Sequence, residues 1–177
     1  MMARKEKVVQ ELTDNVKRLL EGHNIEIIHG TAKLTGPDRI EVALSTPGAK
    51  KSEQLVLQAK AIILATGGKP TTLSGLEFDG QHIVSSRETL KFDTVPKHLA
   101  IVGGGYIGLE LGSVWLRLGA KVTVIEMLPQ IGTTLDGQVG RKLQRVLKRQ
   151  GINFHLQTKV TGAKIAGKSV QVDLETK

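Results

Sequence analysis

The 177-residue chain is 40% hydrophobic, lacks cysteine and has a formal net charge of +8. This composition suffices for a packed core, and it excludes disulfides, thiolate metal sites and a cysteine nucleophile within these residues. The sequence has no apolar run long enough to cross a bilayer and begins with polar residues 1–7, so we expect a soluble intracellular protein without a signal peptide.

The first third of the chain predicts a helix followed by a small antiparallel sheet. Apolar residues recur every three or four positions over residues 3–21, which is typical of one helix face, and Gly22 follows. Short β-like runs come next at 25–29, 31–34, 40–44 and 55–57, separated by turn residues at Gly36-Pro37 and Pro47-Gly48. We therefore predict an antiparallel β-meander.

A continuous apolar run at 61–65 predicts a parallel strand that is buried on both faces. It ends in Thr66-Gly67-Gly68, where the backbone can approach a ligand, although a simple turn is the alternative. Residues 69–98 are mostly connection, and we place a domain junction near Pro96.

A strand at 99–102 then leads into the spacing G-x-G-x-x-G and a further helix. In a dinucleotide site, Gly103 would allow the tight turn, Gly105 the approach of the phosphates, and Gly108 close packing of the helix on the strand. Free N–H groups of the first helical turn would face the anion. The alternative is a strand–helix–strand unit whose glycines serve packing alone.

The next strand, 121–126, ends in an acid at the position of a ribose-binding carboxylate. We expect Glu126 to accept hydrogen bonds from the adenine ribose, unless it is merely a solvated strand end. A 2′-phosphate would meet a like charge there, and residues 127–130 contain no Arg to neutralise it. The sequence therefore favours NAD over NADP.

The last part of the chain predicts a helix over 138–150 that stops at Gly151, a strand at 152–156, and β-like runs at 160–165 and 170–174. The helix has the densest basic group in the chain, and its other face has four apolar residues: Arg141, Lys142, Arg145, Lys148 and Arg149 against Val139, Leu143, Val146 and Leu147. This pattern is typical of a solvated face, and binding of an acidic partner is the alternative. With 3% aromatic residues, nucleic-acid binding is the weaker alternative, and the scattered histidines predict no metal site.

Three segments together carry a family resemblance: ILATGGKP at 63–70, VSSRETLKFDTVPKHLAIVGGGYIGLELGSVWLRLGAKVTVIE at 84–126, and QGINFHLQTKVTGA at 150–163. The chain closely resembles the dihydrolipoyl dehydrogenases, which belong to the flavin-dependent pyridine nucleotide-disulfide oxidoreductases. The GGGYIGLE core recurs across that superfamily, and GSVWLRLGAKVTVIE narrows the choice. The similarity covers nearly the whole chain.

The resemblance implies an α/β fold: a Rossmann-like parallel sheet of an NAD-binding domain plus part of an FAD-binding domain with a β-meander. Residues 1–96 would form the partial FAD-binding domain, and residues 97–177 a C-terminally incomplete NAD-binding domain. It also implies FAD contacts by Ala32, Thr66, Gly67 and Gly68. Gly68 stands where the family usually has Ser, and Ala32 where relatives often have Gly.

On the NAD side, the resemblance implies contacts by residues of the glycine turn, the ribose carboxylate and the adenine end: Gly103, Gly104, Gly105, Tyr106, Ile107, Gly108, Glu110, Glu126 and Val160. Tyr106 would cover the nicotinamide pocket, or else pack at the helix start. Glu110 would pair with a lysine near the flavin ring, or else be a surface acid.

Several family features have no counterpart in this sequence: the N-terminal flavin GxGxxG, the redox cysteine pair and the lysine after it, the second acidic FAD motif, and the C-terminal dimer domain with its His-Glu base. We therefore expect an interior fragment with no catalytic residue of its own and no dihydrolipoyl dehydrogenase activity alone.

In the complete protein, the resemblance implies NAD and FAD as cofactors, a homodimer, and as substrates the dihydrolipoyl groups of 2-oxoacid dehydrogenase or glycine cleavage complexes. It places such a protein in the bacterial cytoplasm or the mitochondrial matrix. The alternatives are a stand-alone NAD-binding module and half of a split flavoprotein reductase without disulfide chemistry.

Overall fold

The structure, a computed structural model, describes residues 1–45, 54–167 and 169–176. The chain divides into two compact units, Met1–Gly68 and Lys69–Lys177. Among the described residues, no helix combines the length and the apolar content needed to span a membrane.

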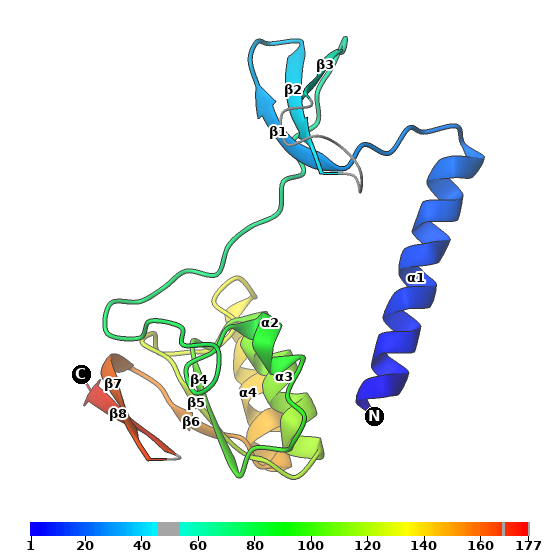
Figure 1. The fold of residues 1–177 in the computed structure, drawn as a ribbon. Coiled ribbons are helices and arrows are strands. Elements are labelled where there is room, and N and C mark those ends of the chain that lie inside the picture. The colour runs from blue at the N-terminus through cyan, green and yellow to red at the C-terminus, as the bar shows by residue number, and fades with distance from the viewer. Residues whose placement is uncertain (46–53, 168, 177) are drawn as a thin grey trace. The chain divides into compact units, whose positions relative to one another are not determined.

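The first unit contains the predicted helix and meander (Figure 1). Helix α1 spans Met2–Gly22, and strands β1 (Gly30–Leu34), β2 (Arg39–Leu44) and β3 (Gln54–Gln58) pair antiparallel in that order. Val42 on the central strand is the buried hydrophobic residue of this sheet. Its neighbours across the sheet are Ala32 and Leu55. The turn predicted at Pro47-Gly48 lies outside the described residues.

Two predicted strands of the first unit are wrong. Residues 25–29 form the irregular link between α1 and β1, and residues 61–65 are also irregular. Ile63 is 91% exposed and Leu64 67%. A parallel strand is stable only when neighbouring strands accept and donate its backbone hydrogen bonds. Within the described part of this unit, the sheet order β1-β2-β3 offers no such neighbour to residues 61–65.

The second unit is built on a three-stranded parallel sheet with the order β4-β5-β6. Strands β4 (His98–Val102), β5 (Lys121–Ile125) and β6 (Asn153–His155) alternate with helices α3 (Tyr106–Arg117) and α4 (Gly137–Gln150). Figure 1 shows both helices on one side of this sheet. The sheet and its two helices confirm the predicted α/β, Rossmann-like class.

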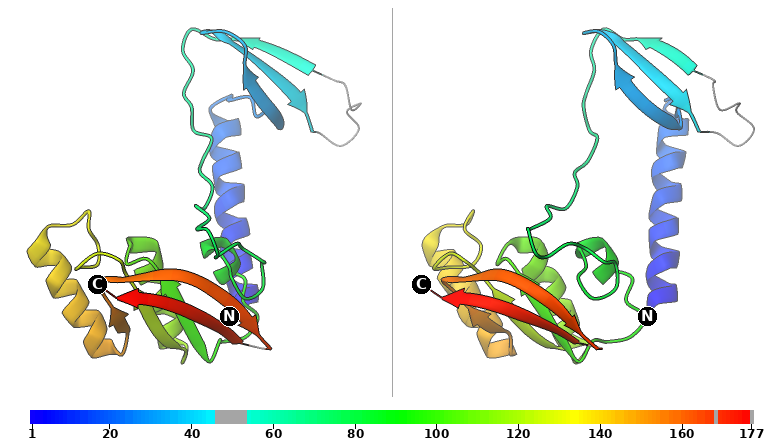
Figure 2. Two further views of the ribbon diagram at one scale, coloured as in Figure 1. Left: turned by 90° about the vertical axis from the view of Figure 1, so that its left-hand side faces the viewer. Right: turned by 60° about the vertical axis from the view of Figure 1, so that its left-hand side comes forward.

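The remaining elements of the second unit are a short helix and a hairpin. Helix α2 spans Ser86–Thr89 in the segment that the sequence predicts as connection. Strands β7 (Thr158–Ala166) and β8 (Ser169–Thr176) pair antiparallel, with a bulge between Val160 and Gly162. They are the orange and red arrows in Figure 2.

The core of the second unit lies between the parallel sheet and its helices. Val122, Val124, Ile131 and Ile152 are each less than 2% exposed, which stabilises the unit by about 1.5–3 kcal/mol per side chain. Phe92 packs on Trp115 of α3 with ring centroids 5.4 Å apart. This contact helps to explain why residues 69–96 belong to the second compact unit, whose boundary falls at Gly68 instead of near Pro96.

Candidate functional site

The glycine turn, residues 103–108, joins β4 to the start of α3 as the G-x-G-x-x-G spacing predicts. Gly103 has a φ of 102°, which an L side chain rarely adopts, and its N–H donates to the Ile125 carbonyl at 2.8 Å. Gly105 is the N-cap of α3 and has extended backbone. The turn therefore reverses the chain at the carboxyl end of the parallel sheet, where nucleotides bind in this fold class.

Gly108 brings α3 close to β4. A Cβ at this position would lie 2.9 Å from Ile101 Cγ2 and 3.1 Å from the Gly103 carbonyl oxygen. Both approaches are shorter than ordinary contacts, and one of them is to backbone. The packing role predicted for Gly108 therefore has a direct steric cause.

Glu126 is held against the glycine turn. Its Oε2 accepts from the Gly104 N–H at 2.6 Å, and its Oε1 accepts from the Leu128 N–H at 2.8 Å. Each carboxylate oxygen keeps further acceptor capacity, since an ionised carboxylate offers about four lone-pair sites. The structure thus brings together the two features that the sequence pairs for a dinucleotide site, the glycine turn and the acid at the end of β5.

Ile131 packs against the junction of the glycine turn and Glu126, a contact that the sequence does not predict. Ile131 is fully buried, and a Cβ on Gly104 would lie 2.9 Å from its Cγ2. The next residue, Gly132, donates its N–H to the Gly104 carbonyl at 2.8 Å. The loop after Glu126 therefore packs against the turn and holds Gly104 in place. An isolated apolar residue between Gln130 and Gly132 is the signal that marks it in the sequence.

The N-terminus of α3 presents donors that suit a diphosphate. The Leu109 N–H donates to the carbonyl of the N-cap residue Gly105 at 3.1 Å and so begins the hydrogen-bond ladder of α3. The N–H groups of Tyr106, Ile107 and Gly108 precede it, and helix geometry gives them no intrahelical acceptor. A Cβ at Gly105 would meet none of the described atoms within 4 Å, so space above the backbone is open. Free backbone N–H groups at an accessible helix N-terminus are donors of the kind that bind the phosphates of a dinucleotide.

The outer surface of this helix start is accessible. Tyr106 is 70% exposed and Ile107 46%, and Glu110 is exposed one turn further along α3. The exposure of Tyr106 favours the expected cover of a nicotinamide over packing at the helix start, and its role stays a prediction. Its ring is free to contact a planar ligand.

Val160, expected at the adenine end, lies half-buried on β7. The hairpin is tied to the end of β5 because Thr158 N–H donates to the Glu126 carbonyl at 3.0 Å. Nearby, Met127, Gln157, Lys159 and Glu175 line a hollow of about 250 Å³. The residues at the end of β5 and the start of β7 therefore form one surface next to Glu126.

The residues expected to contact FAD all belong to the first unit. Ala32 is exposed on β1 opposite Val42. Thr66, Gly67 and Gly68 lie in the exposed irregular segment that follows residues 61–65. Gly67 has a φ of 73°, so glycine suits this position.

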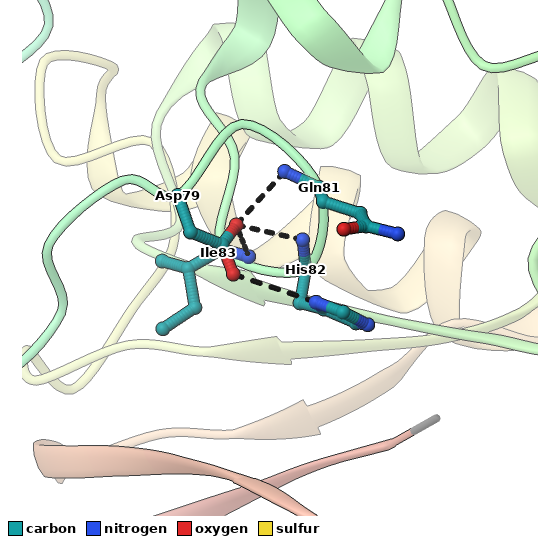
Figure 3. A network of polar contacts seen from close by, with 4 residues as sticks. All are labelled: Asp79, Gln81, His82 and Ile83. Carbon is teal, nitrogen blue, oxygen red and sulfur yellow. Dashed lines mark hydrogen bonds and ion pairs between the residues drawn. The ribbon is translucent and has the colours of Figure 1, made fainter. Parts of the chain in front are cut away.

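A second polar cluster in the second unit stabilises the chain ahead of β4 (Figure 3). Asp79 Oδ1 accepts from the N–H groups of Gln81, His82 and Ile83 at 2.8, 2.7 and 2.9 Å. These bonds lower the pKa of Asp79 to about 2. His82 Nδ1 lies 3.4 Å from Asp79 Oδ2. The Asp79 carboxylate thus caps three backbone N–H groups and so stabilises the conformation of this loop.

A capping box begins α2 just after that loop. The Ser85 hydroxyl accepts from the Arg87 N–H at 3.2 Å, and Glu88 Oε2 accepts from the Ser85 N–H at 2.8 Å. The pKa of Glu88 is lowered, first by its hydrogen bond from the Ser85 side chain. The spacing S-x-x-E at 85–88 is the sequence signal for this helix start, which the prediction of connection over 69–98 missed.

Comparison with known families gives the class of this protein. Residues 2–177 match the family described as Pyridine nucleotide-disulphide oxidoreductase. The chain belongs to this family.

Within that class, the chain is similar to curated dihydrolipoyl dehydrogenases. It is 44% identical over 175 residues to Dihydrolipoyl dehydrogenase 3 of Pseudomonas aeruginosa, covering 99% of this chain and 36% of the relative. It is 39% identical over 175 residues to the mitochondrial dihydrolipoyl dehydrogenase of Schizosaccharomyces pombe, covering 99% and 34%. Leghemoglobin reductase of Glycine max is 38% identical, with 99% and 32% covered. The chain spans about a third of the length of these relatives.

Solved structures agree on the fold. The HOCl-induced flavoprotein disulfide reductase RclA from Escherichia coli has a TM-score of 0.81 at 26% identity, covering 98% of this chain and 38% of that one. LpdA from Mycobacterium tuberculosis has a TM-score of 0.83 at 21% identity, with the same coverage, and supports the fold alone.

Proposed function

We propose that this chain holds NAD for a flavin-dependent dihydrolipoyl dehydrogenase. The observation that carries the proposal is the hydrogen bond of 2.6 Å between Gly104 N–H and Glu126 Oε2. It joins the turn that would bind the diphosphate to the carboxylate that would bind the ribose. The similarity to curated dihydrolipoyl dehydrogenases over 99% of the chain supports the choice of reaction.

In this proposal, the residues of the second unit bind and orient one dinucleotide. The N–H groups at the start of α3 hold the diphosphate, assisted by the helix dipole. Glu126, Gly103 and Gly104 form the ribose side of the site, and Val160 borders the adenine. Tyr106 and Glu110 lie on α3 toward the nicotinamide end. NAD and FAD supply the hydride chemistry when bound, so the role of these residues is placement of the nicotinamide.

The carboxylate sets the preference between the two pyridine nucleotides. Glu126 is held close to the turn by the Gly104 N–H, so a 2′-phosphate on the ribose would enter next to a fixed negative charge. Lys159 and Glu175 both line the neighbouring hollow, so the positive charge of Lys159 is accompanied there by a negative charge. We therefore infer binding of NAD over NADP.

The first unit would contribute to the FAD site of the same enzyme through Ala32, Thr66, Gly67 and Gly68. The substrates and partners would be dihydrolipoyl groups carried by 2-oxoacid dehydrogenase or glycine cleavage complexes, and a second copy of the complete protein. The proposed compartment is the cytoplasm or the mitochondrial matrix. The disulfide step needs thiols from outside these residues, since the sequence contains no cysteine.

A stand-alone NAD-binding module is the second candidate. The buried cluster of the second unit, which includes Val122, Val124, Ile131 and Ile152, favours it because a unit with its own core can bind a ligand without further domains.

Isothermal titration of the full chain with NAD and with NADP tests the nucleotide proposal. We expect NAD to bind at least about tenfold tighter than NADP, and the isosteric change Glu126→Gln to reduce that ratio severalfold by removing the charge. Glu26→Gln, at an exposed position of the first unit, is the matched control and should leave the ratio unchanged. Equal binding of NAD and NADP by the unaltered chain, or an unchanged ratio in Glu126→Gln, would contradict the proposal.

A further inference from the structure

Helix α4 presents an unusual charge pattern that the nucleotide site does not use. Its 14 residues include five cations and no carboxylate: Arg141, Lys142, Arg145, Lys148 and Arg149. All five are exposed. The ion pairs found among the described residues join other side chains, so none of them neutralises this group. The neighbouring Asp136 is engaged as the N-cap, since its side chain accepts from the N–H groups of Gln138 and Val139.

The five cations lie on the exposed side of helix α4. At 3.6 residues per turn, Lys142, Arg145 and Arg149 lie on one line opposite the buried Leu147, and Arg141 and Lys148 lie on one flank. Lys142 and Arg149 are about 10 Å apart along the axis. We call the five residues the basic face of α4. Like charges at this spacing repel one another, which destabilises helix α4 slightly when no partner is bound. An anionic partner would remove this repulsion.

The other flank of the helix is apolar and exposed. The sequence pattern groups Val139 and Val146 with the apolar face of the helix, but the structure leaves them 52% and 42% exposed. The core takes Leu147 and part of Leu143 instead. Because Val139 and Val146 are seven positions apart in the sequence, they lie on one line of the helix, beside the basic residues. At the N-terminal end, the surface is hollowed by about 440 Å³ between Gln138, Val139, Arg141, Lys142 and Arg145.

From this pattern we propose that the basic face of α4 is a docking surface for an acidic amphipathic helix of another protein. Carboxylates of such a helix at positions i, i+3 and i+7 match Lys142, Arg145 and Arg149, and apolar residues beside them meet Val139 and Val146. A nucleic acid would use the cations but not the valine flank, and the chain has 3% aromatic residues for base stacking. Charge complementarity and the paired valines therefore favour an acidic protein segment.

Fluorescence anisotropy of a labelled synthetic peptide tests the docking surface on the full chain. The probe is an acidic helix with Glu at i, i+3 and i+7 and Leu on the adjoining line. A peptide of the same composition in scrambled order and a 20-base-pair DNA duplex are compared with it. We expect the scrambled peptide to bind about tenfold more weakly, because its charges and leucines no longer fall on two lines. Binding should weaken severalfold between 50 and 300 mM salt.

Matched variants separate the surface from net charge. The triple change Lys142→Glu, Arg145→Glu and Arg149→Glu should weaken peptide binding at least about tenfold, and Val146→Ser severalfold. The same charge change at exposed positions outside α4, Lys69→Glu, Lys97→Glu and Lys164→Glu, should have a much smaller effect. Circular dichroism establishes that each variant folds. If the triple variant with Glu does not fold, the neutral triple variant Lys142→Gln, Arg145→Gln and Arg149→Gln is used in its place.

Any of four results would overturn the proposal. One is equal binding of the ordered and scrambled peptides. Another is tighter binding of the DNA duplex than of the ordered peptide. The third is absence of peptide binding at 50 mM salt. The fourth is a loss of binding that is the same in the α4 variant and in the control variant. NAD titration of the same samples reports the nucleotide site separately, so failure of one proposal is distinguishable from failure of the other.

Discussion

The substitution Gly108→Ala tests the close packing that positions the helix start. The added Cβ would lie 2.9 Å from Ile101 Cγ2 and 3.1 Å from the Gly103 carbonyl oxygen. Ile101 is half-buried against the core and the second contact is backbone, so α3 must move away from β4 by a few tenths of an ångström. Overpacking of this kind costs about 1–3 kcal/mol, and the higher helix propensity of Ala offsets about 1 kcal/mol of it.

We therefore expect Gly108→Ala to destabilise the second unit by about 0–2 kcal/mol in urea unfolding. The movement of α3 should also weaken NAD binding about tenfold, equivalent to one charge-assisted hydrogen bond of about 1.5 kcal/mol. Gly137→Ala is the matched control, since its Cβ would meet only the flexible Arg141 Nη1 at 3.3 Å and the side chain of Gln130 at 3.7 Å. If Gly108→Ala binds NAD normally and is as stable as Gly137→Ala, the packing argument is refuted.

Three further predictions concern the second unit and the chain as a whole. Ser85→Ala removes the capping box of α2 and should lower the free energy of unfolding by about 0.5–2 kcal/mol in urea unfolding, and an unchanged midpoint would contradict that role. Because backbone hydrogen bonds hold the pKa of Asp79 at about 2, below its usual 3.9, its carboxylate contributes stability that is present above pH 4 and lost as pH falls toward 2. Asp79→Ala should therefore flatten the dependence of melting temperature on pH in this range, whereas Asp93→Ala should not. The full chain, which lacks cysteine, should not turn over dihydrolipoamide with NAD, and turnover without an added partner would contradict this expectation.

The sequence predicts those elements whose stability is local or whose partners lie within the same unit. The helix over 138–150 begins after the Asp136 cap and ends at Gly151 with a φ of 114°, so its boundaries are encoded in its own residues. The parallel strands around the glycine turn are likewise correct, because β5 supplies the neighbours that β4 and β6 need.

The predictions that fail depend on partners beyond the local sequence. The apolar run at 61–65 has the composition of a buried parallel strand, but the described part of its unit supplies no strand alongside it. The sequence does not predict the hydrogen bond from Gly104 to Glu126 or the packing of Ile131 on Gly104, because both contacts join residues far apart in sequence. A spacing motif identifies the turn, but it does not identify the loop that packs beneath it.

The central claim is that a dinucleotide diphosphate binds at the start of α3 beside Glu126. Titration of the isotope-labelled chain with NAD, followed through its backbone amide resonances, tests this claim most directly. The account predicts that the largest shifts fall on residues 103–108 and on residues 126–128, and that the amides of β1, β2 and α4 move little. Shifts centred on any other surface, or no shifts at millimolar NAD, would contradict it.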